Sequence, residues 1–313
     1  MDALREGFSI GIEEEYLLVD PETRALSVRQ PSGFMARCKE LLGPRVAHEV
    51  LQSQIEIVSR VCANIGEART EILELLMSQV SYFMPHLLAL STSSPFWEGH
   101  DTGLKAFRPI IIGDLPRSGL PETFESWNDW TEMLDDLAAT GMVTDPSKIW
   151  WDLRPSARHP TLEIRICDIC TWAEDGLTIA ALYQSILAFL YSLRANNQRW
   201  RQYRRILILE NKWRAQRYGV EAEMGDFGKR ALVPFSELID ELVEILRPHA
   251  AALGCLAEVE HARTIARRGT SADHQLRVYK DALGAGAGDH EAQVAVVDWL
   301  MAQSARADGA APD

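Results

Sequence analysis

Three consecutive glutamates interrupt an apolar segment near the start of the chain. Ile10-Gly11-Ile12 precedes Glu13, Glu14 and Glu15, and Leu17-Leu18-Val19 follows them. Because side chains alternate between the faces of a β-strand, we expect Glu13 and Glu15 on one face and Glu14 on the other. Carboxylates sharing one face repel each other and are costly to desolvate unless a cation or hydrogen-bond donors compensate. The pattern is typical of a divalent-metal site; a half-solvated strand with surface glutamates is the alternative interpretation.

A second polar face is expected in the segment from His48 to Ile57. Read as one strand, the segment places Glu56 on the same side as Gln54 and Gln52, with His48 farther along. If this strand pairs with the first one, Glu56 comes close to the first glutamate cluster. A polar stripe that faces solvent explains the alternation equally well, so both interpretations stay open.

Two further strands are predicted over residues 148–154 and 161–169. In the second strand Glu163 and Arg165 share a face, whereas Leu162, Ile164 and Ile166 take the opposite face. An acid and an arginine at this spacing also form ordinary structural ion pairs, which is the simpler interpretation of the pattern alone.

Helical periodicity dominates the rest of the chain. A short helix is expected after Pro31, closed by Gly43-Pro44, and Pro85 is expected to kink or break a helix over residues 66–92. The stretch from Ser91 to Pro121 is predicted to be an irregular loop that carries Arg108, and such loops often line functional sites. Further helices are predicted over residues 124–137, 175–193, 197–215, 234–253, 256–268, 271–283 and 289–304. We expect one domain over residues 1–304 and a disordered tail over 305–313.

Charge and cysteine content exclude several classes of protein. The chain has 32 Lys and Arg against 45 Asp and Glu, and its net charge of -13 argues against nucleic acid or an anionic membrane as the main partner. The five cysteines are scattered, so we expect no disulfide framework, and we interpret Cys167 and Cys170 as core thiols rather than zinc ligands. With no secretory signal and no membrane-spanning run, a cytoplasmic protein is expected.

Six separated segments occur in a specific order along the chain. They are residues 11–15, residues 48–56, Ser94-Pro95 with Gly99 and Asp101-Thr102, residues 151–156, residues 161–165 with Asp168, and Asn211 with Arg217-Tyr218-Gly219. In this order they resemble the carboxylate-amine ligase family related to bacterial type 2 glutamate-cysteine ligase, whose fold is similar to the catalytic domain of glutamine synthetase. The expected fold class is α+β, a mostly antiparallel sheet with carboxylates on its polar face and helices covering the other face.

The resemblance implies an ATP-dependent reaction. ATP would phosphorylate a substrate carboxylate, and an amine would attack the acyl phosphate to give an amide. In the family's best-known pair, the carboxylate is the γ-carboxylate of glutamate and the amine is cysteine. By resemblance, the candidate Mg²⁺ ligands are Glu13, Glu15, Glu56 and Glu163, whereas Glu14 is left out because it does not share their face. Arg154 and Arg165 would hold phosphate or carboxylate, and Asn211 and Arg217 would contact nucleotide or substrate. Family members are often homo-oligomers, so self-association is expected.

One departure from the family pattern stands out. The family carries an internal region with a Thr-His-Pro-Phe-like segment and a His-Val-His-Val-Gly-like strand, and neither motif is present here. The junction lies near residues 77–81, where two helical patterns run together. Two alternatives to the ligase therefore stay open. One is a degenerate member that binds a nucleotide or amino acid without catalysis, and the other is a metal-dependent hydrolase, for which no dinuclear ligand spacing is visible.

Overall fold

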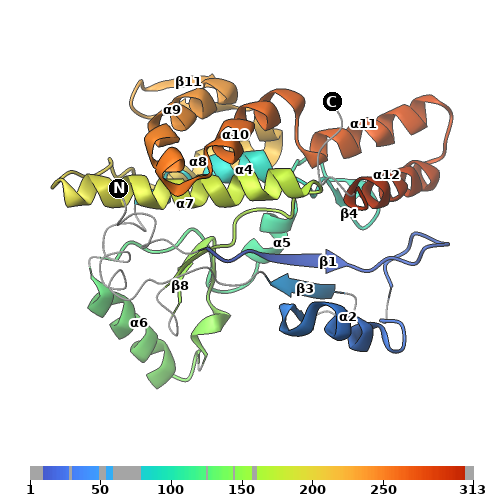
Figure 1. Cartoon of the computed structure of the whole chain (residues 1–313), viewed down its shortest axis with the longest axis horizontal. Helices are drawn as coiled ribbons and strands as arrows, with labels where there is room; N and C mark the ends of the chain where they lie inside the picture. Colours follow the sequence, from blue (N-terminus) through green and yellow to red (C-terminus); the bar gives the residue numbers. More distant parts are fainter. Residues whose placement is uncertain are drawn as a thin grey trace.

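The protein is an α+β structure built around one long apolar helix. A computed structural model describes residues 10–27, 30–48, 54–58, 79–124, 126–143, 145–156 and 161–306. Helix α7 (Ala173–Ala195) crosses the molecule, with a helical layer on one side and the strands β1 and β8 on the other (Figure 1). The helical layer consists of α4 (Met84–Ser91), α8 (Arg205–Tyr218), α9 (Phe235–Leu253) and α10 (Leu256–Arg268).

Helix α7 is buried because apolar residues occur around most of its circumference. Leu182, Ile186 and Leu190 are at most 1% exposed and belong to the main hydrophobic core. By length and composition α7 is the one helix in the described ranges that satisfies the criterion for crossing a membrane, and half of its most apolar window is buried in the protein. Since core helices pass the same test, this is weak evidence for a membrane span.

The C-terminal helices follow the predicted ranges closely. After α9 and α10, helix α11 (Ser271–Gly284) and helix α12 (Asp289–Ser304) pair at one end of the molecule (Figure 1). Thr270 and Asp273 form a capping box that starts α11. Trp172, at the N-cap of α7, packs edge-on against Trp299 of α12 and joins this helix pair to the core.

The first predicted strand is confirmed, and the second is divided in two. Strands β1 (Glu13–Leu17), β3 (Gln54–Val58) and β2 (Val46–His48) form an antiparallel sheet in the order β1-β3-β2. The prediction of one strand from His48 to Ile57 is wrong, because His48 ends β2 and pairs with Ile55 of β3. The residues between these strands, 49–53 with Gln52, lie outside the described residues.

The expected single sheet is not present in the described part of the chain. Its strands form five small sheets, of which four are antiparallel and one, β6 (Ser118–Gly119) with β7 (Trp150–Trp151), is parallel. The strand predicted over residues 148–154 is interrupted at Asp152. The Asp152 backbone nitrogen donates to the Gly119 oxygen, and its oxygen accepts from the Arg165 nitrogen. The other pairs are β4 (Phe96–Trp97) with β5 (His100–Asp101), β8 (Leu153–Pro155) with β9 (Leu162–Ile164), and β10 (Glu223–Asp226) with β11 (Ala231–Pro234).

One helix prediction needs correction. Residues 197–204 are not helical, because Asn197 adopts a positive φ of 55° and α8 begins only at Arg205. The predicted break at Pro85 is confirmed: a turn over residues 81–83 ends the helical stretch at Val80, and Pro85 lies in the first turn of the new helix α4, where proline is well tolerated. Residues 59–78 lie outside the described residues, so most of the helix predicted over 66–92 is not tested.

The remaining helices lie near the sheets. Arg108 was placed in a predicted irregular loop, but it begins helix α5 (Arg108–Gly113). Helix α2 (Phe34–Leu42) ends at Gly43 as predicted, and α6 (Trp127–Ala139) is capped by Ser126. Three short 3-10 helices complete the described structure: η1 (Gly43–Arg45), η2 (Pro146–Lys148) and η3 (Gly219–Glu221). Residues 307–313 of the predicted tail are outside the described residues.

Candidate active site

Strands β1 and β3 bring two of the predicted carboxylates directly opposite each other. In the antiparallel register Glu15 pairs with Glu56, and Glu13 lies two residues earlier on the same face of β1. Like charges in opposite positions of a sheet destabilise it unless something compensates. Glu14 faces the other way: it accepts a hydrogen bond from the Tyr16 hydroxyl at 2.6 Å and approaches Gly176 in the first turn of α7. The predicted alternation of faces is therefore present.

Charged side chains of the β8–β9 hairpin shift the pKa of Glu13. Partial burial raises the pKa of Glu13, and the nearby Glu163 carboxylate raises it further. Arg165 and Arg154 act in the opposite direction, which places all of these groups within electrostatic range of Glu13. The structure thus brings residues from two distant parts of the sequence into one mixed cluster of acids and arginines.

Glu163 is held by both predicted arginines. Arg154 Nη2 lies 2.7 Å from Glu163 Oε2, and Arg165 Nη1 pairs with Oε1. The ion-pair interpretation of the Glu163 and Arg165 pattern is confirmed. Both carboxylate oxygens of Glu163 already accept charge-assisted hydrogen bonds, so a metal ion would compete with the arginines for them.

Arg154 and Arg165 differ in how many hydrogen-bond donors remain available for a ligand. Arg154 donates Nη1 to the carbonyl oxygens of Ser147 and Ile149, both at 2.8 Å, in addition to its two bonds to Glu163. Within the described structure the Arg165 side chain makes one hydrogen bond, from Nη1 to Glu163, and it is 27% exposed. Arg165 is therefore the better placed of the two to bind an anion.

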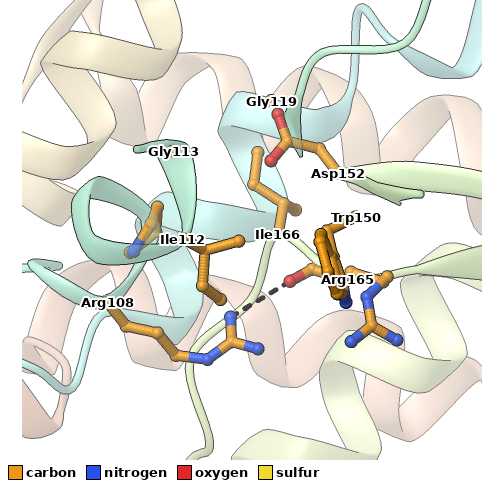
Figure 2. Close-up of a pocket in the computed structure, with 9 residues that line it drawn as sticks. Arg108, Ile112, Gly113, Gly119, Trp150, Asp152, Arg165 and Ile166 are labelled. Atoms are coloured by element: carbon orange, nitrogen blue, oxygen red, sulfur yellow. Dashed lines mark hydrogen bonds between the residues drawn. The ribbon is translucent and has the colours of Figure 1, made fainter. Parts of the chain in front are cut away.

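A small pocket lies next to Arg165, between helix α5 and the turn from β7 to β8. Its walls include Arg108, Ile112, Trp150, Asp152, Arg165 and Ile166. Figure 2 shows the guanidinium groups of Arg108 and Arg165 on the same side of the pocket, with the Asp152 carboxylate at the opposite end. Arg108 Nη1 donates to the Arg165 carbonyl oxygen at 3.1 Å and to the Cys167 carbonyl oxygen at 3.2 Å (Figure 2).

The far end of the pocket is fixed by a buried ion pair. Lys212 Nζ, on α8, lies 2.6 Å from Asp152 Oδ2, and both side chains are 10% exposed. The Asp152 backbone donates to Gly119 and accepts from Arg165, both at 2.8 Å. Asp152 therefore connects α8, β6 and the segment that carries Arg165.

The predicted nucleotide contacts, Asn211 and Arg217, also lie on α8 but contact other segments. Asn211 is 2% exposed, and its amide accepts from the Gly225 nitrogen at 2.7 Å and donates to the Gly225 oxygen at 2.9 Å. Arg217 lies beside Gly103, with its guanidinium 5.6 Å from the centre of the Tyr218 ring. Among the contacts of the described residues, neither side chain meets the acid and arginine cluster, so their predicted role in binding nucleotide or substrate stays a prediction.

The cluster suits a divalent cation in its chemistry. Carboxylate oxygens are preferred ligands of Mg²⁺, and the sheet places Glu15 opposite Glu56 with Glu13 on the same face of β1. Over the residues that the structure describes, however, no three His, Cys, Asp or Glu side chains come close enough to form a metal site. The four glutamates thus fit a cation by donor type and charge, while their arrangement as a set of ligands remains a prediction.

The C-x-x-C cysteines are free thiols at the edge of the core. Burial raises the pKa of Cys167 to about 12 and that of Cys170 well above its ordinary value. Thiols with raised pKa values are poor nucleophiles and poor metal ligands at neutral pH. The described cysteines, Cys38, Cys167, Cys170 and Cys255, form no disulfide with one another.

Two residues of this site are not among the sequence predictions, and a third is placed in the wrong element. Asp152 lies inside one of the matching segments, and Lys212 lies in the helix predicted over residues 197–215, but the sequence singles out neither. Arg108 is predicted in a loop and lies in helix α5. A buried carboxylate needs a cationic partner, which was a usable signal for Asp152, whereas its pairing with Lys212, 60 residues away, is set by the tertiary structure.

Comparison with known proteins identifies close relatives. The profile of glutamate-cysteine ligase family 2 (GCS2) matches residues 75–296. A protein of Rhodospirillum rubrum named "Putative glutamate--cysteine ligase 2" is 42% identical over an alignment that spans 97% of this chain and 98% of the relative. A protein of the same name from Jannaschia sp. is 41% identical, over 95% of this chain and 96% of the relative.

Two solved structures share the fold at low sequence identity. A bifunctional glutathione synthetase from Pasteurella multocida has a TM-score of 0.64 and 12% identity, over 96% of this chain and 53% of its own. A glutamate–cysteine ligase from Francisella tularensis, solved in complex with AMP, has a TM-score of 0.61 and 10% identity, over 96% of this chain and 89% of its own. At these identities the comparison concerns the fold alone.

The alignment to the Rhodospirillum relative also shows how many residues this chain lacks. It has 382 positions, which exceeds the 313 residues of this chain by 69. At least 69 residues of the relative therefore have no counterpart here. The profile match begins at residue 75, next to the junction predicted near residues 77–81. This agrees with the absence of the two sequence motifs noted above.

Proposed function

This chain belongs to glutamate-cysteine ligase family 2, and from that membership we propose that it is an ATP-dependent carboxylate-amine ligase. ATP would phosphorylate a carboxylate of glutamate, and an amine such as cysteine would displace the phosphate to form an amide. The observation that carries this proposal is the pairing of Glu163 with both Arg154 and Arg165, close enough to β1 for their charges to act on Glu13. It gathers acids and guanidinium groups where phosphoryl transfer needs both.

We assign the roles as follows. Glu13, Glu15 and Glu56 would hold Mg²⁺, which would supply positive charge against the phosphates of ATP. Glu163 orients Arg165 through their ion pair, and Arg165 would stabilise the phosphate or carboxylate oxygens. Arg154, with its bonds to Glu163 and to two carbonyl oxygens, would keep Glu163 in place.

Support for ATP as the phosphoryl donor comes from the fold. The Francisella structure with the same fold is described as a complex with AMP, so a relative of this architecture accommodates an adenine nucleotide. Asn211 and Arg217 remain our candidates for nucleotide or substrate contacts. We further expect a cytoplasmic homo-oligomer whose ligands are small amino acids.

The second candidate is a family member that binds nucleotide or amino acid without turnover. The absence of at least 69 residues that the Rhodospirillum relative contains favours it, because part of the family's strand structure lies in that region. Magnesium-dependent ATP binding with no product formation would support this alternative.

The deciding experiment measures ADP release from ATP in the presence of Mg²⁺, glutamate and a panel of amines that includes cysteine. A ligase releases ADP only when both acid and amine are present. We expect Glu13→Gln and Arg165→Ala to lower kcat at least 100-fold, because each removes charge from the phosphoryl-transfer site. The control for Glu13→Gln is Glu22→Gln, in the exposed turn after β1, and the control for Arg165→Ala is Arg267→Gln, at an exposed position of α10. Both control variants should keep the activity of the parent.

Two results would count against the proposal. If the folded parent releases no ADP with any pair of acid and amine, the non-catalytic candidate replaces the ligase. If the parent is active and the Glu13 and Arg165 variants remain within a few-fold of it, the acid and arginine cluster is not the catalytic site.

A further inference from the structure

Arg108 is a cation in the pocket without a carboxylate partner. Lys212 neutralises Asp152, and Glu163 pairs with both Arg154 and Arg165, but no carboxylate of the described residues lies within ion-pair distance of Arg108. Its hydrogen bonds in the described structure use Nη1 alone, leaving Nε and Nη2 for a ligand. A partly buried guanidinium with free donors is suited to a carboxylate or a phosphate.

The backbone around Arg108 is held by a buried acid. Ser94 Oγ donates to Asp168 Oδ2 at 2.7 Å and accepts from the backbone nitrogens of Phe107 and Arg108 at 2.9 and 3.0 Å. The Ser93 nitrogen donates to the same Asp168 oxygen at 2.9 Å. Asp168 is 5% exposed, and among the described residues its other oxygen has no hydrogen-bond partner. This network fixes the first turn of α5 and therefore the direction of the Arg108 side chain.

The shape of the pocket limits what it can accept. Its enclosed part has room for about one water-sized atom, such as a single carboxylate oxygen, and the pocket is partly open to solvent. Ile112 and Ile166 give it apolar walls, and Trp150 lies beside Arg165 (Figure 2). Such a pocket suits the charged end of a small aliphatic acid whose remaining atoms extend outward.

Arg165 connects this pocket to the acid and arginine cluster, since its guanidinium lines the pocket and pairs with Glu163. We propose that Arg108 binds the second, non-reacting carboxylate of an amino dicarboxylic acid, while its reacting carboxylate lies toward Arg165, Glu13 and Glu163. The inference rests on the proposed function, because it takes that cluster as the reacting centre. Ser94 and Asp168 act as positioning residues for Arg108.

Calorimetric titration tests the pocket without requiring turnover. The ligands are L-glutamate, glutarate, which keeps both carboxylates, and 4-aminobutyrate, which lacks the second one. We expect Arg108→Gln to weaken binding of glutamate and glutarate 10- to 100-fold, about the effect of one charge-assisted hydrogen-bonding group. Binding of 4-aminobutyrate should be weak in the parent and unchanged in the variant. Arg267→Gln is the matched control and should bind all three acids like the parent.

Further variants separate binding from folding. Arg108→Lys keeps the positive charge but loses the forked donor geometry, so it should weaken binding of the dicarboxylates less than Arg108→Gln does. Ser94→Ala removes the hydroxyl that holds Arg108 and should weaken binding of the dicarboxylates but not of 4-aminobutyrate. Thermal melts followed by circular dichroism establish that each titrated variant is folded.

Three outcomes would overturn the inference. They are parent-like glutamate binding by folded Arg108→Gln, an equal loss of 4-aminobutyrate binding, and no binding of glutamate or glutarate to the parent at millimolar concentration. Failure of the ligase is distinguishable from these outcomes. If the parent releases no ADP but Arg108→Gln weakens glutamate binding, the pocket proposal holds and the ligase proposal fails. If the parent is active and Arg108→Gln leaves the KM for glutamate unchanged, the ligase proposal holds and the pocket proposal fails.

Discussion

The ionised Glu13 side chain lowers the stability of the folded chain. Its raised pKa means that the carboxylate is less favourable in the folded chain than in the unfolded one, chiefly through partial burial and then through Glu163. A glutamine of the same shape would avoid this cost. Functional groups often reduce stability in this way, because a site prepared for a ligand lacks the ligand's charge when it is empty.

This predicts a stability gain for Glu13→Gln that depends on pH. A glutamate whose pKa is raised on folding costs nothing below its unfolded pKa, near 4.3, and the cost grows as pH rises through the folded value. We therefore expect Glu13→Gln to unfold at higher urea concentration than the parent at pH 7, with no difference at pH 4. The gain should be on the order of 0.5 kcal/mol or less, because solvent screens this exposed strand.

Urea titrations at the two pH values check the prediction, with Glu22→Gln as the control. Glu22 is exposed in the turn after β1, and its replacement should leave the unfolding midpoint unchanged at both pH values. A Glu13→Gln variant that is less stable than the parent at pH 7 would show that Glu13 has a structural role instead.

At the scale of elements, the Lys212 and Asp152 ion pair joins helix α8 to the strands that carry the site. Both side chains are almost fully buried, so removing one leaves an uncompensated charge in the interior. We expect Lys212→Ala to lower the free energy of unfolding by about 3 kcal/mol, the lower end of the usual range for breaking a buried pair.

The matched control is Arg37→Ala on helix α2. Arg37 pairs with Glu40 at 2.7 Å, but the two side chains are 70% and 65% exposed, so its loss should cost less than about 1 kcal/mol. Equilibrium unfolding in urea measures both variants. Similar losses for Lys212→Ala and Arg37→Ala would mean that burial does not make the Asp152 pair important for docking of α8.

Prediction from sequence succeeded where an element's period was uninterrupted. The four C-terminal helices and β1 were anticipated because their apolar spacing and caps are local properties of the sequence. The strands around Asp152 were predicted too long, since its backbone bonds to Gly119 and Arg165 are tertiary contacts. Helix α8 was predicted to start too early because the positive φ of Asn197 has no clear signal in a basic, otherwise helical pattern.

The candidate site was predictable only in part, for a similar reason. The alternation of Glu13, Glu14 and Glu15 follows from strand geometry and is present in β1. Carbonyl groups from other segments use up Nη1 of both Arg154 and Arg108. The sequence does not show which donors of these two arginines are used in this way. Sequence patterns identify which groups are charged, whereas the available donors are decided by packing.

At the scale of the whole molecule, the chain belongs to the family but lacks residues that a relative contains. The chain shares 42% identity with a full-length relative and yet lacks at least 69 of the positions in their alignment. Its described strands form small separate sheets. The acid and arginine cluster nevertheless assembles from β1, β3 and the β8–β9 hairpin. We expect that cluster to be sufficient for phosphoryl transfer to a carboxylate.

The most direct test follows an oxygen atom. The chain is incubated with ATP, Mg²⁺, an amine and glutamate whose side-chain carboxylate carries ¹⁸O, and the released phosphate is analysed by mass spectrometry. Formation of an acyl phosphate transfers one carboxylate oxygen to phosphate, so the account predicts one ¹⁸O in each phosphate released. Unlabelled phosphate from simple ATP hydrolysis, or release of AMP and pyrophosphate, would contradict it.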